Sequence, residues 1–306
     1  MKGVIKIGTR DSALALWQAE YIKSLVEEKG EKAELVHIKS EGEIDLVRPL
    51  YEIGVQGIFT KTLDSALLNG KIDIAVHSLK DVPTQVPEGL IFAATPKRGP
   101  HADLLIYKNL APDASAEIPY TVATSSLRRR AQWLNRYPHH VLEPIRGNIN
   151  SRIQKLNTTM HWDATVMAAA GVDRIQLNIP NRITLDWMLP APAQGALGIF
   201  CRNNDHAILE LCSAMNDADT QKATLAERQF LRTLMGGCTM PIAAFAYIEK
   251  DTLHLHGNVL TIDGKQKAEI AVSAPASDEP QSVGEKAALQ LLDQGGREIL
   301  HILKSK

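Results

Sequence analysis

The chain has 306 residues, more than one ordinary hydrophobic core accommodates, which indicates two or three domains. Apolar residues make up 44% and charged residues 23%, a composition that excludes disordered, fibrous and membrane chains. Lysine and arginine total 34 against 35 acidic residues, so no global basic field exists to recruit nucleic acid or an anionic membrane surface.

The sequence contains no signal for export or for membrane insertion. An alternating strand pattern begins at Val4, without a preceding long apolar run or cleavage site, and no run approaches the roughly 18 apolar residues of a membrane span. We therefore expect a cytoplasmic protein. Cys201, Cys212 and Cys238 are odd in number and lack Cys-x-x-Cys spacing, which predicts free thiols and no metal site.

The first two thirds of the chain alternate short apolar runs with amphipathic stretches, the pattern of βα units in an α/β fold. Ser12 is the predicted N-cap of the helix that follows the first strand, and a further helix is expected at residues 63–69. In chain order, the predicted strands are 4–8, 33–38, 72–76, 122–124, 141–145 and 164–168.

Two segments rich in proline and glycine, residues 95–100 and 189–195, indicate crossings between domains. After about residue 214 the pattern changes to one helix, three alternating strands and a single final helix at about 283–303. We expect two hinged α/β lobes like those of periplasmic binding proteins and a small C-terminal α+β domain. The predicted domains are residues 1–96 with 192–213, residues 97–191 and residues 214–306.

Cationic and hydroxyl side chains recur directly after the predicted strands. Ligands bind at the carboxyl ends of strands in open α/β sheets, and arginine pairs bidentately with carboxylates, so the set predicts a crevice for a polyanion. For any single arginine a solvated helical turn is the simpler interpretation, and the run 128–130 alone is typical of a wet helix face. The set comprises Arg10, Ser12, Lys80, Ser125, Ser126, Arg128, Arg129, Arg146, Arg152 and Arg174.

Asp81, next to Lys80, is the best candidate for proton chemistry. A carboxylate beside a cation tends to stay ionised and can stabilise developing positive charge. A structural role in a turn before Pro83 is the more common outcome for such a pair. His77, at the same strand end, is expected to be a satisfied histidine near the core.

Cys238 follows Gly236 and Gly237 in a predicted loop between helix and strand. The glycines let the backbone fold away and leave the thiol exposed, where a thiolate can act as a nucleophile. A small buried side chain is the competing interpretation, and it is the one we expect for Cys201 and Cys212.

Five sequence blocks follow one another along the chain: 7–15 (IGTRDSALA), 74–84 (IAVHSLKDVPT), 124–132 (TSSLRRRAQ), 145–149 (IRGNI) and 236–238 (GGC). In these blocks and their order the chain resembles the porphobilinogen deaminase family, also called hydroxymethylbilane synthases, over essentially its whole length. The resemblance implies a transferase of porphyrin and heme biosynthesis. Such an enzyme joins four porphobilinogen molecules head to tail, releases ammonia at each step and hydrolyses the product to the linear tetrapyrrole hydroxymethylbilane.

The resemblance also implies the cofactor and the site residues. Family members make a dipyrromethane cofactor from two substrate molecules and link it by a thioether to the loop cysteine, here Cys238. The aspartate matching Asp81, with Lys80 beside it, assists ammonia loss and the later deprotonation. Implied cofactor contacts are Lys80, Asp81, Ser12, Ser125, Ser126, Arg128, Arg129 and Arg146. Implied substrate contacts are Arg10, Arg146, Arg152, Arg174 and Gln194.

The chain departs from the family pattern at Gln56, Ala193 and Met235, where lysine, glycine and glutamate are common, and it lacks the usual arginine near His101. None of these differences removes a predicted catalytic residue. The resemblance further implies a monomer that passes its product to uroporphyrinogen-III synthase.

Two other classes of protein remain open. A two-lobed carboxylate-binding protein without catalysis would need neither Cys238 nor Asp81. A nucleic-acid binder that uses the arginine run at 128–130 is disfavoured by the net charge of −1.

Overall fold

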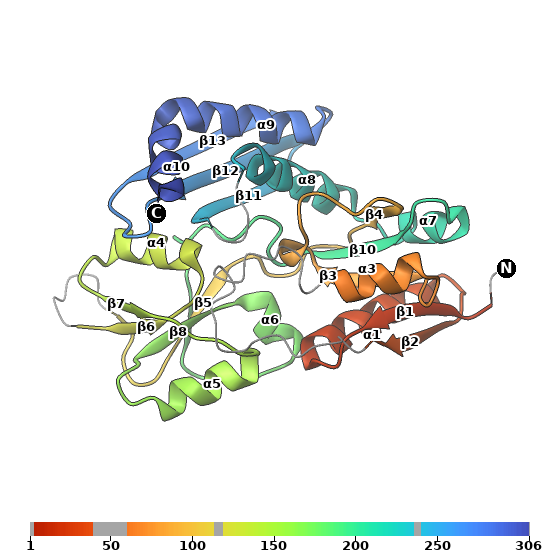
Figure 1. Cartoon of the computed structure of the whole chain (residues 1–306), viewed down its shortest axis with the longest axis horizontal. Helices are drawn as coiled ribbons and strands as arrows, with labels where there is room; N and C mark the ends of the chain where they lie inside the picture. Colours follow the sequence, from red (N-terminus) through yellow and green to blue (C-terminus); the bar gives the residue numbers. More distant parts are fainter. Residues whose placement is uncertain (1–2, 39–59, 113–118, 236–239, 306) are drawn as a thin grey trace.

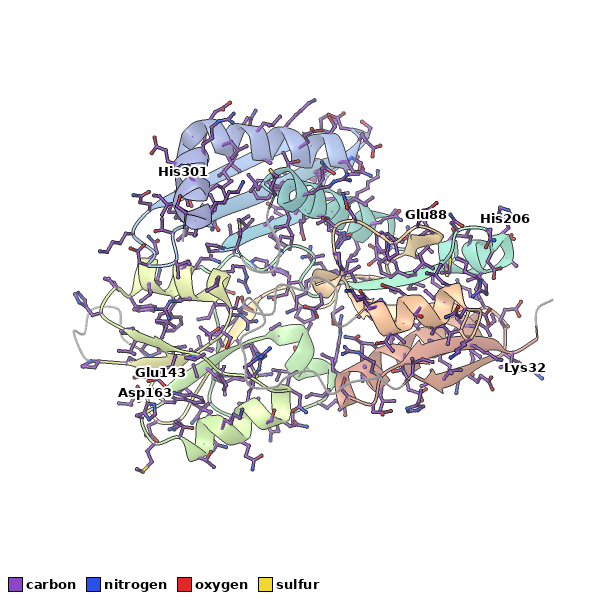
Figure 2. All side chains as sticks on the ribbon, in the orientation of Figure 1. Lys32, Glu88, Glu143, Asp163, His206 and His301 are labelled. Atoms are coloured by element: carbon purple, nitrogen blue, oxygen red, sulfur yellow. The ribbon has the colours of Figure 1, made fainter. Side chains whose placement is uncertain are left out.

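The computed structural model describes residues 3–38, 60–112, 119–235 and 240–305. These residues form two five-stranded sheets and one three-stranded sheet, each with helices packed against it (Figure 1). Side chains fill the space between the ribbons, while charged residues such as Lys32 and Glu88 lie at the periphery (Figure 2). No helix in the described ranges is long and apolar enough to cross a membrane.

The first lobe is built on a mixed sheet in which β1 is parallel to β2 and β3, whereas β10 is antiparallel to β3 and β4. Ile22 and Val26 of the first helix pack on Ile5 and Ile7 of the sheet, and all four are at most 2% exposed. The strand order is β2 (Ala33–His37), β1 (Ile5–Thr9), β3 (Ile74–Ser78), β10 (Leu197–Arg202) and β4 (Leu90–Ala94). The lobe's helices are α1 (Ala13–Glu28), α3 (Lys61–Leu68) and α7 (His206–Ser213).

The second lobe has a sheet of the same size and similar design. Here β6 is parallel to β7 and β8, and β5 is antiparallel to β8 and β9. The strand order is β7 (Val141–Glu143), β6 (Thr121–Ala123), β8 (Ala164–Ala168), β5 (Asp103–Tyr107) and β9 (Arg182–Thr184). Its helices are α4 (Leu127–Arg136), α5 (Ile149–Thr158) and α6 (Ala169–Arg174).

The C-terminal part is an antiparallel meander with helices packed on it. The strands are β11 (Ile242–Glu249), β12 (Thr252–Leu260) and β13 (Lys267–Pro275), and the helices are α8 (Ala218–Thr233), α9 (Pro280–Leu291) and α10 (Arg297–Lys304). The prediction of one unbroken final helix is wrong. Gly295 adopts φ 96°, a left-handed conformation that an α-helix does not continue through, so α9 and α10 are separate helices joined by the η2 segment Leu292–Gly296.

The predicted fold class, two α/β lobes with a small α+β domain, is confirmed. The chain leaves the first lobe after β4 and returns to it as β10, so two connections link the lobes (Figure 1). These connections touch where the Gly99 N–H donates to the Gly195 carbonyl at 3.2 Å. The predicted domain boundaries are compatible with this sheet membership and stay a prediction.

Candidate active site

A cavity of about 350 Å³ is lined by residues of both lobes. That volume lies within the range of small-molecule sites. The first lobe contributes Arg10, Ser12, Lys80 and Asp81, and the second contributes Arg129, Arg152 and Arg174. The structure thus brings together seven of the residues predicted to act on or bind a ligand.

The strands of the first lobe explain why its residues reach this cavity. Neighbouring parallel strands β1 and β3 end at the same edge of the sheet. Arg10 follows β1 directly, and the Ser12 side chain caps α1 by accepting from the Ala15 N–H at 3.3 Å. β3 runs straight into the 3₁₀ turn η1 (Leu79–Asp81), so Lys80 and Asp81 leave the sheet beside Arg10.

In the second lobe the arginines come from helices that start at the carboxyl edge of its sheet. Asn148 caps α5, and its side chain accepts from the Ser151 N–H at 2.9 Å. The Arg152 Nε donates to the Gly147 carbonyl at 2.8 Å, which holds that side chain over the start of the helix. The first turn of α5 lines the cavity, and a helix N-terminus favours anions.

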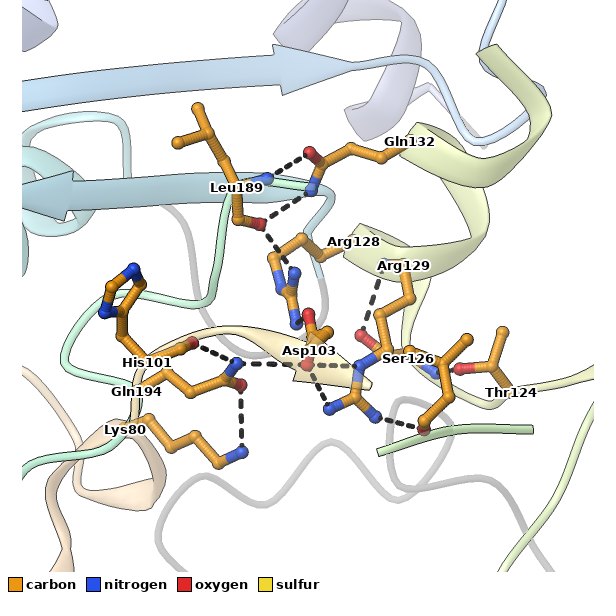
Figure 3. Close-up of polar contacts among 11 residues, drawn as sticks. Lys80, His101, Asp103, Thr124, Ser126, Arg128, Arg129, Gln132, Leu189 and Gln194 are labelled. Atoms are coloured by element: carbon orange, nitrogen blue, oxygen red, sulfur yellow. Dashed lines mark hydrogen bonds and ion pairs between the residues drawn. The ribbon is translucent and has the colours of Figure 1, made fainter. Parts of the chain in front are cut away.

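Asp103 is the centre of a buried polar network between the lobes (Figure 3). Its carboxylate is fully buried and pairs with Arg128 at 2.7 Å and with Arg129 at 2.7 Å. Burial alone would raise the pKa of Asp103, but Arg128 and Arg129 outweigh that effect and hold the pKa well below its usual range. Sequence reasoning missed this residue because an acidic side chain at the start of an apolar strand carries no recognisable signal.

Gln194 connects that network to the first lobe. Its amide nitrogen donates to the His101 carbonyl at 2.8 Å and to Asp103 at 3.0 Å, and its amide oxygen accepts from Lys80 Nζ at 3.1 Å (Figure 3). Gln194 itself is fully buried. The cavity-lining lysine of one lobe and the buried arginines of the other are therefore linked through two side chains, Gln194 and Asp103.

Several predicted binding residues do not line the cavity. Arg128 is one of them, and it donates to the Leu189 carbonyl at 2.7 Å. Arg128 is 5% exposed and the cavity-lining Arg129 is 7% exposed, so the interpretation of a wet helix face is wrong for both. The Ser125 hydroxyl donates to the Ile145 carbonyl at 2.8 Å. The residues predicted to bind but absent from the lining are Arg128, Arg146, Ser125, Ser126 and Gln194. Their binding roles remain predictions.

Other predicted features have mixed outcomes. Cys201 and Cys212 are buried and take part in no disulfide, as expected. The described ranges hold no group of three His, Cys, Asp or Glu side chains suited to a metal ion. Cys238 and Gln56 lie outside the described residues. His77 is near the core as predicted, but the prediction that it is satisfied is wrong, because its Nε2 has no hydrogen-bond partner in the described structure.

A second buried ion pair lies beside the connections between the lobes. The carboxylate of Glu227 in α8 is completely buried and pairs with Arg98 at 2.6 Å. It also accepts from the main-chain N–H groups of Ala193 at 2.5 Å and Ala246 at 2.6 Å. Ala193 has φ 62°, in the left-handed region that favours glycine, the residue expected at this position from the resemblance. The hydrogen bond from its N–H to Glu227 holds the main chain in this conformation.

Burial weakens the basicity of Lys80, Arg152 and Arg174, three of the cations that line the cavity. Removal from water lowers the pKa of Lys80 to about 8 and the pKa values of Arg152 and Arg174 to about 10. For Arg152 the nearby Arg129 adds to this effect. A cluster of desolvated cations is stabilised when an anionic ligand joins it, so the geometry favours a ligand with several carboxylates.

Comparisons with known proteins identify the family to which the chain belongs. The model of the porphobilinogen deaminase dipyromethane cofactor binding domain matches residues 5–210, and that of the porphobilinogen deaminase C-terminal domain matches residues 221–293. The chain is 41% identical over 300 residues to the porphobilinogen deaminase of Trichlorobacter lovleyi, covering 97% of this chain and 95% of the relative. It is 40% identical over 309 residues to that of Chlorobium phaeobacteroides, covering 98% of each.

Among solved structures, the chain is similar to an ancestral cationic amino acid solute binding protein, at 15% identity and a TM-score of 0.43, covering 70% of this chain and 88% of that one. It is also similar to an arginine-specific periplasmic binding protein of Salmonella typhimurium, at 12% identity and a TM-score of 0.42, covering 70% and 92%. The family models and the relatives together span nearly the whole sequence. The chain therefore belongs to the porphobilinogen deaminase family.

Proposed function

We propose that the chain is a hydroxymethylbilane synthase that joins four porphobilinogen molecules and releases ammonia at each step. The observation that carries this proposal is the convergence of Asp81, Lys80 and arginines from both lobes on one cavity. Porphobilinogen carries an acetate and a propionate group, so each substrate ring needs cationic partners. The alternative, a carboxylate-binding protein without catalysis, is not favoured because it would not require Asp81 or a cofactor-binding domain.

The residues that line the cavity fit the dipyrromethane cofactor of the family. That group bears several carboxylates, and a guanidinium has five N–H donors. Among the described residues, main-chain carbonyls occupy part of this capacity, since Arg152 donates to Gly147 and Arg174 donates to Gly195 at 2.6 Å. When bound, the cofactor supplies the pyrrole carbon to which the first substrate is joined. We propose that Cys238 is its attachment point.

Asp81 is the proposed catalytic residue. Loss of ammonia from porphobilinogen leaves a cationic azafulvene, and a fixed carboxylate beside it stabilises that charge. Attack by a pyrrole carbon then leaves a proton to be removed, for which the same carboxylate is a suitable acceptor. We assign Arg10, Arg152 and Arg174 to the substrate carboxylates, whose binding brings the reacting carbon to Asp81.

The two connections between the lobes support a proposal about chain growth. Each added ring brings two more carboxylates, and the paired segments around Gly99 and Gly195 are the place where the lobes can move relative to each other. We propose the three domains set out above as the moving parts. We further propose a cytoplasmic monomer that passes its product to uroporphyrinogen-III synthase.

The proposed function is tested by incubating the purified protein with porphobilinogen. We expect about four molecules of ammonia for each hydroxymethylbilane formed, because each ring that is joined loses the nitrogen of its aminomethyl group as ammonia and keeps the methylene carbon as the bridge. Ammonia is measured by a coupled dehydrogenase assay and the bilane by chromatography. Tight binding of porphobilinogen without ammonia release would instead support the carboxylate-binding alternative.

The lowered pKa of Lys80 predicts a specific pH dependence. Because the pKa is about 8, the ammonium group loses its charge as the pH rises through 8, and its attraction for carboxylates disappears. We therefore expect KM for porphobilinogen to rise above pH 8. Lys80→Arg keeps its charge at any working pH and should remove this rise. An unchanged KM profile in Lys80→Arg would show that the charge of Lys80 does not contribute to substrate binding.

A further inference from the structure

A second, smaller cavity adjoins the main one beside Asp81. Its volume is about 70 Å³, enough for a few molecules the size of water or ammonia and too small for a substituted pyrrole ring. The residues that line both cavities are Arg10, Ser12, Leu14, Ser78 and Asp81. The small cavity therefore lies next to the carboxylate at which ammonia would be released.

The wall of the small cavity is polar although it is buried. Thr9, Gln18, Thr60 and His77 all line it, and none is more than 6% exposed. The Gln18 amide donates to the Ser78 hydroxyl at 2.8 Å. Buried polar groups of this kind stabilise small polar guests and do not favour an empty space.

His77 is the exception in this wall because its Nε2 has no hydrogen-bond partner among the described residues. The Oδ1 atom of Asp64 is 3.9 Å from that nitrogen, beyond hydrogen-bonding distance. The other face of the ring is packed, since Phe200 meets it edge to face at a centroid distance of 5.6 Å. A buried nitrogen left without a partner is costly, so this atom is suited to a ligand that donates a hydrogen bond.

The imidazole of His77 is an uncharged hydrogen-bonding group. Burial, aided by the positive charge of Arg10, lowers the pKa of His77 to about 3, so the ring is uncharged at physiological pH. Burial also raises the pKa of the neighbouring Asp64. A neutral imidazole accepts a hydrogen bond through whichever nitrogen lacks the proton, so it can bind neutral ammonia as a donor.

On the basis of the proposed function, we propose that this small cavity receives the ammonia released from porphobilinogen, with His77 Nε2 as its hydrogen-bond acceptor. The protonated aminomethyl group breaks its C–N bond, and the electron pair leaves with nitrogen. The products are neutral ammonia and the cationic azafulvene, so charge is conserved. Once ammonia has moved into the cavity, it no longer blocks the face of the reacting carbon that the next pyrrole attacks. It takes a proton from water when it reaches solvent.

Added ammonia tests this proposal because it can refill the cavity and re-form the C–N bond. In the wild type, ammonium chloride should inhibit turnover more than potassium chloride of equal ionic strength. Nitrogen-15 from labelled ammonium should appear in unconsumed porphobilinogen. Loss of one hydrogen bond in His77→Leu should raise the inhibition constant for ammonia by about tenfold. His77→Gln supplies another acceptor and should stay close to the wild type.

A second variant tests the cavity without changing His77. Ala15 lines the small cavity and not the main one, and Ala15→Leu adds a side chain of about the cavity's volume while keeping a good helix former. We expect it also to lose the specific ammonium inhibition. Equal ammonium inhibition in the wild type, His77→Leu and Ala15→Leu would overturn the proposal, as would a wild type that responds to ammonium and potassium alike. A wild type that consumes no porphobilinogen would instead overturn the proposed function.

Discussion

Replacing Asp81 with asparagine is expected to lower kcat for porphobilinogen by about 10²- to 10⁴-fold. The amide has the shape of the carboxylate but cannot offset the positive charge that develops when ammonia leaves, and it cannot accept the proton released after coupling. Because Asp81 is exposed at the end of a short turn, the fold should tolerate the change. Steady-state bilane formation and single-turnover ammonia release measure the effect.

A matched control for this variant is Asp11→Asn. Asp11 adjoins Arg10 in the sequence, but its carboxylate is exposed and contacts His37 at 2.8 Å, and it does not line the cavity. Its replacement should leave kcat within about twofold of the wild type, because an exposed ion pair contributes little. An Asp81→Asn enzyme as active as this control would show that the carboxylate of Asp81 has no part in the chemistry.

Replacing Asp103 with asparagine is expected to reduce the free energy of unfolding by about 3–5 kcal/mol. The change leaves the guanidinium groups of Arg128 and Arg129 buried without the carboxylate that now pairs with both at 2.7 Å. Arg129 also lines the cavity, so its displacement should weaken ligand binding as well. Denaturant titration followed by circular dichroism measures the stability.

The control for Asp103 is an exposed pair of the same type in the same lobe. Asp173 pairs with Arg182 at 2.9 Å, and both side chains are 43% exposed. Asp173→Asn should therefore cost less than about 1 kcal/mol. Equal losses of unfolding free energy in Asp103→Asn and Asp173→Asn would mean that burial does not explain how much Asp103 contributes to stability.

The pH dependence of stability gives an independent check on Asp103. Its pKa is depressed in the folded protein, so the stabilisation is fully present above the unfolded carboxyl pKa of about 4 and is lost as the pH falls towards the lower folded value. The difference in unfolding free energy between the wild type and Asp103→Asn should be constant near neutral pH and should become smaller in acid. A difference that grows as the pH falls below 4 would contradict this account.

The alternation of strands and helices could be predicted because each lobe repeats the periods of buried strands and amphipathic helices. The position of β10, antiparallel between β3 and β4, could not be predicted, since pairing across more than 100 residues depends on tertiary packing. The final helix was predicted as continuous because apolar periodicity runs through Gly295, whose left-handed conformation is visible only in the structure.

The candidate site was predictable where residues follow a strand and less so where they depend on burial. Arg10, Lys80 and Asp81 reach the cavity because β1 and β3 end side by side. Arg128 was predicted to contact ligand, yet it is turned to Asp103, a partner 25 positions away in the sequence. The open nitrogen of His77 depends on neighbours from several elements, which a local pattern does not record.

The intact mass of the purified protein tests the central claim most directly. If Cys238 carries a dipyrromethane assembled from substrate, the wild type should exceed the mass calculated from its sequence by two porphobilinogen units less their ammonia. Cys238→Ser should have the unmodified mass and should not form bilane. A wild type of unmodified mass that nevertheless converts porphobilinogen to bilane would contradict the account.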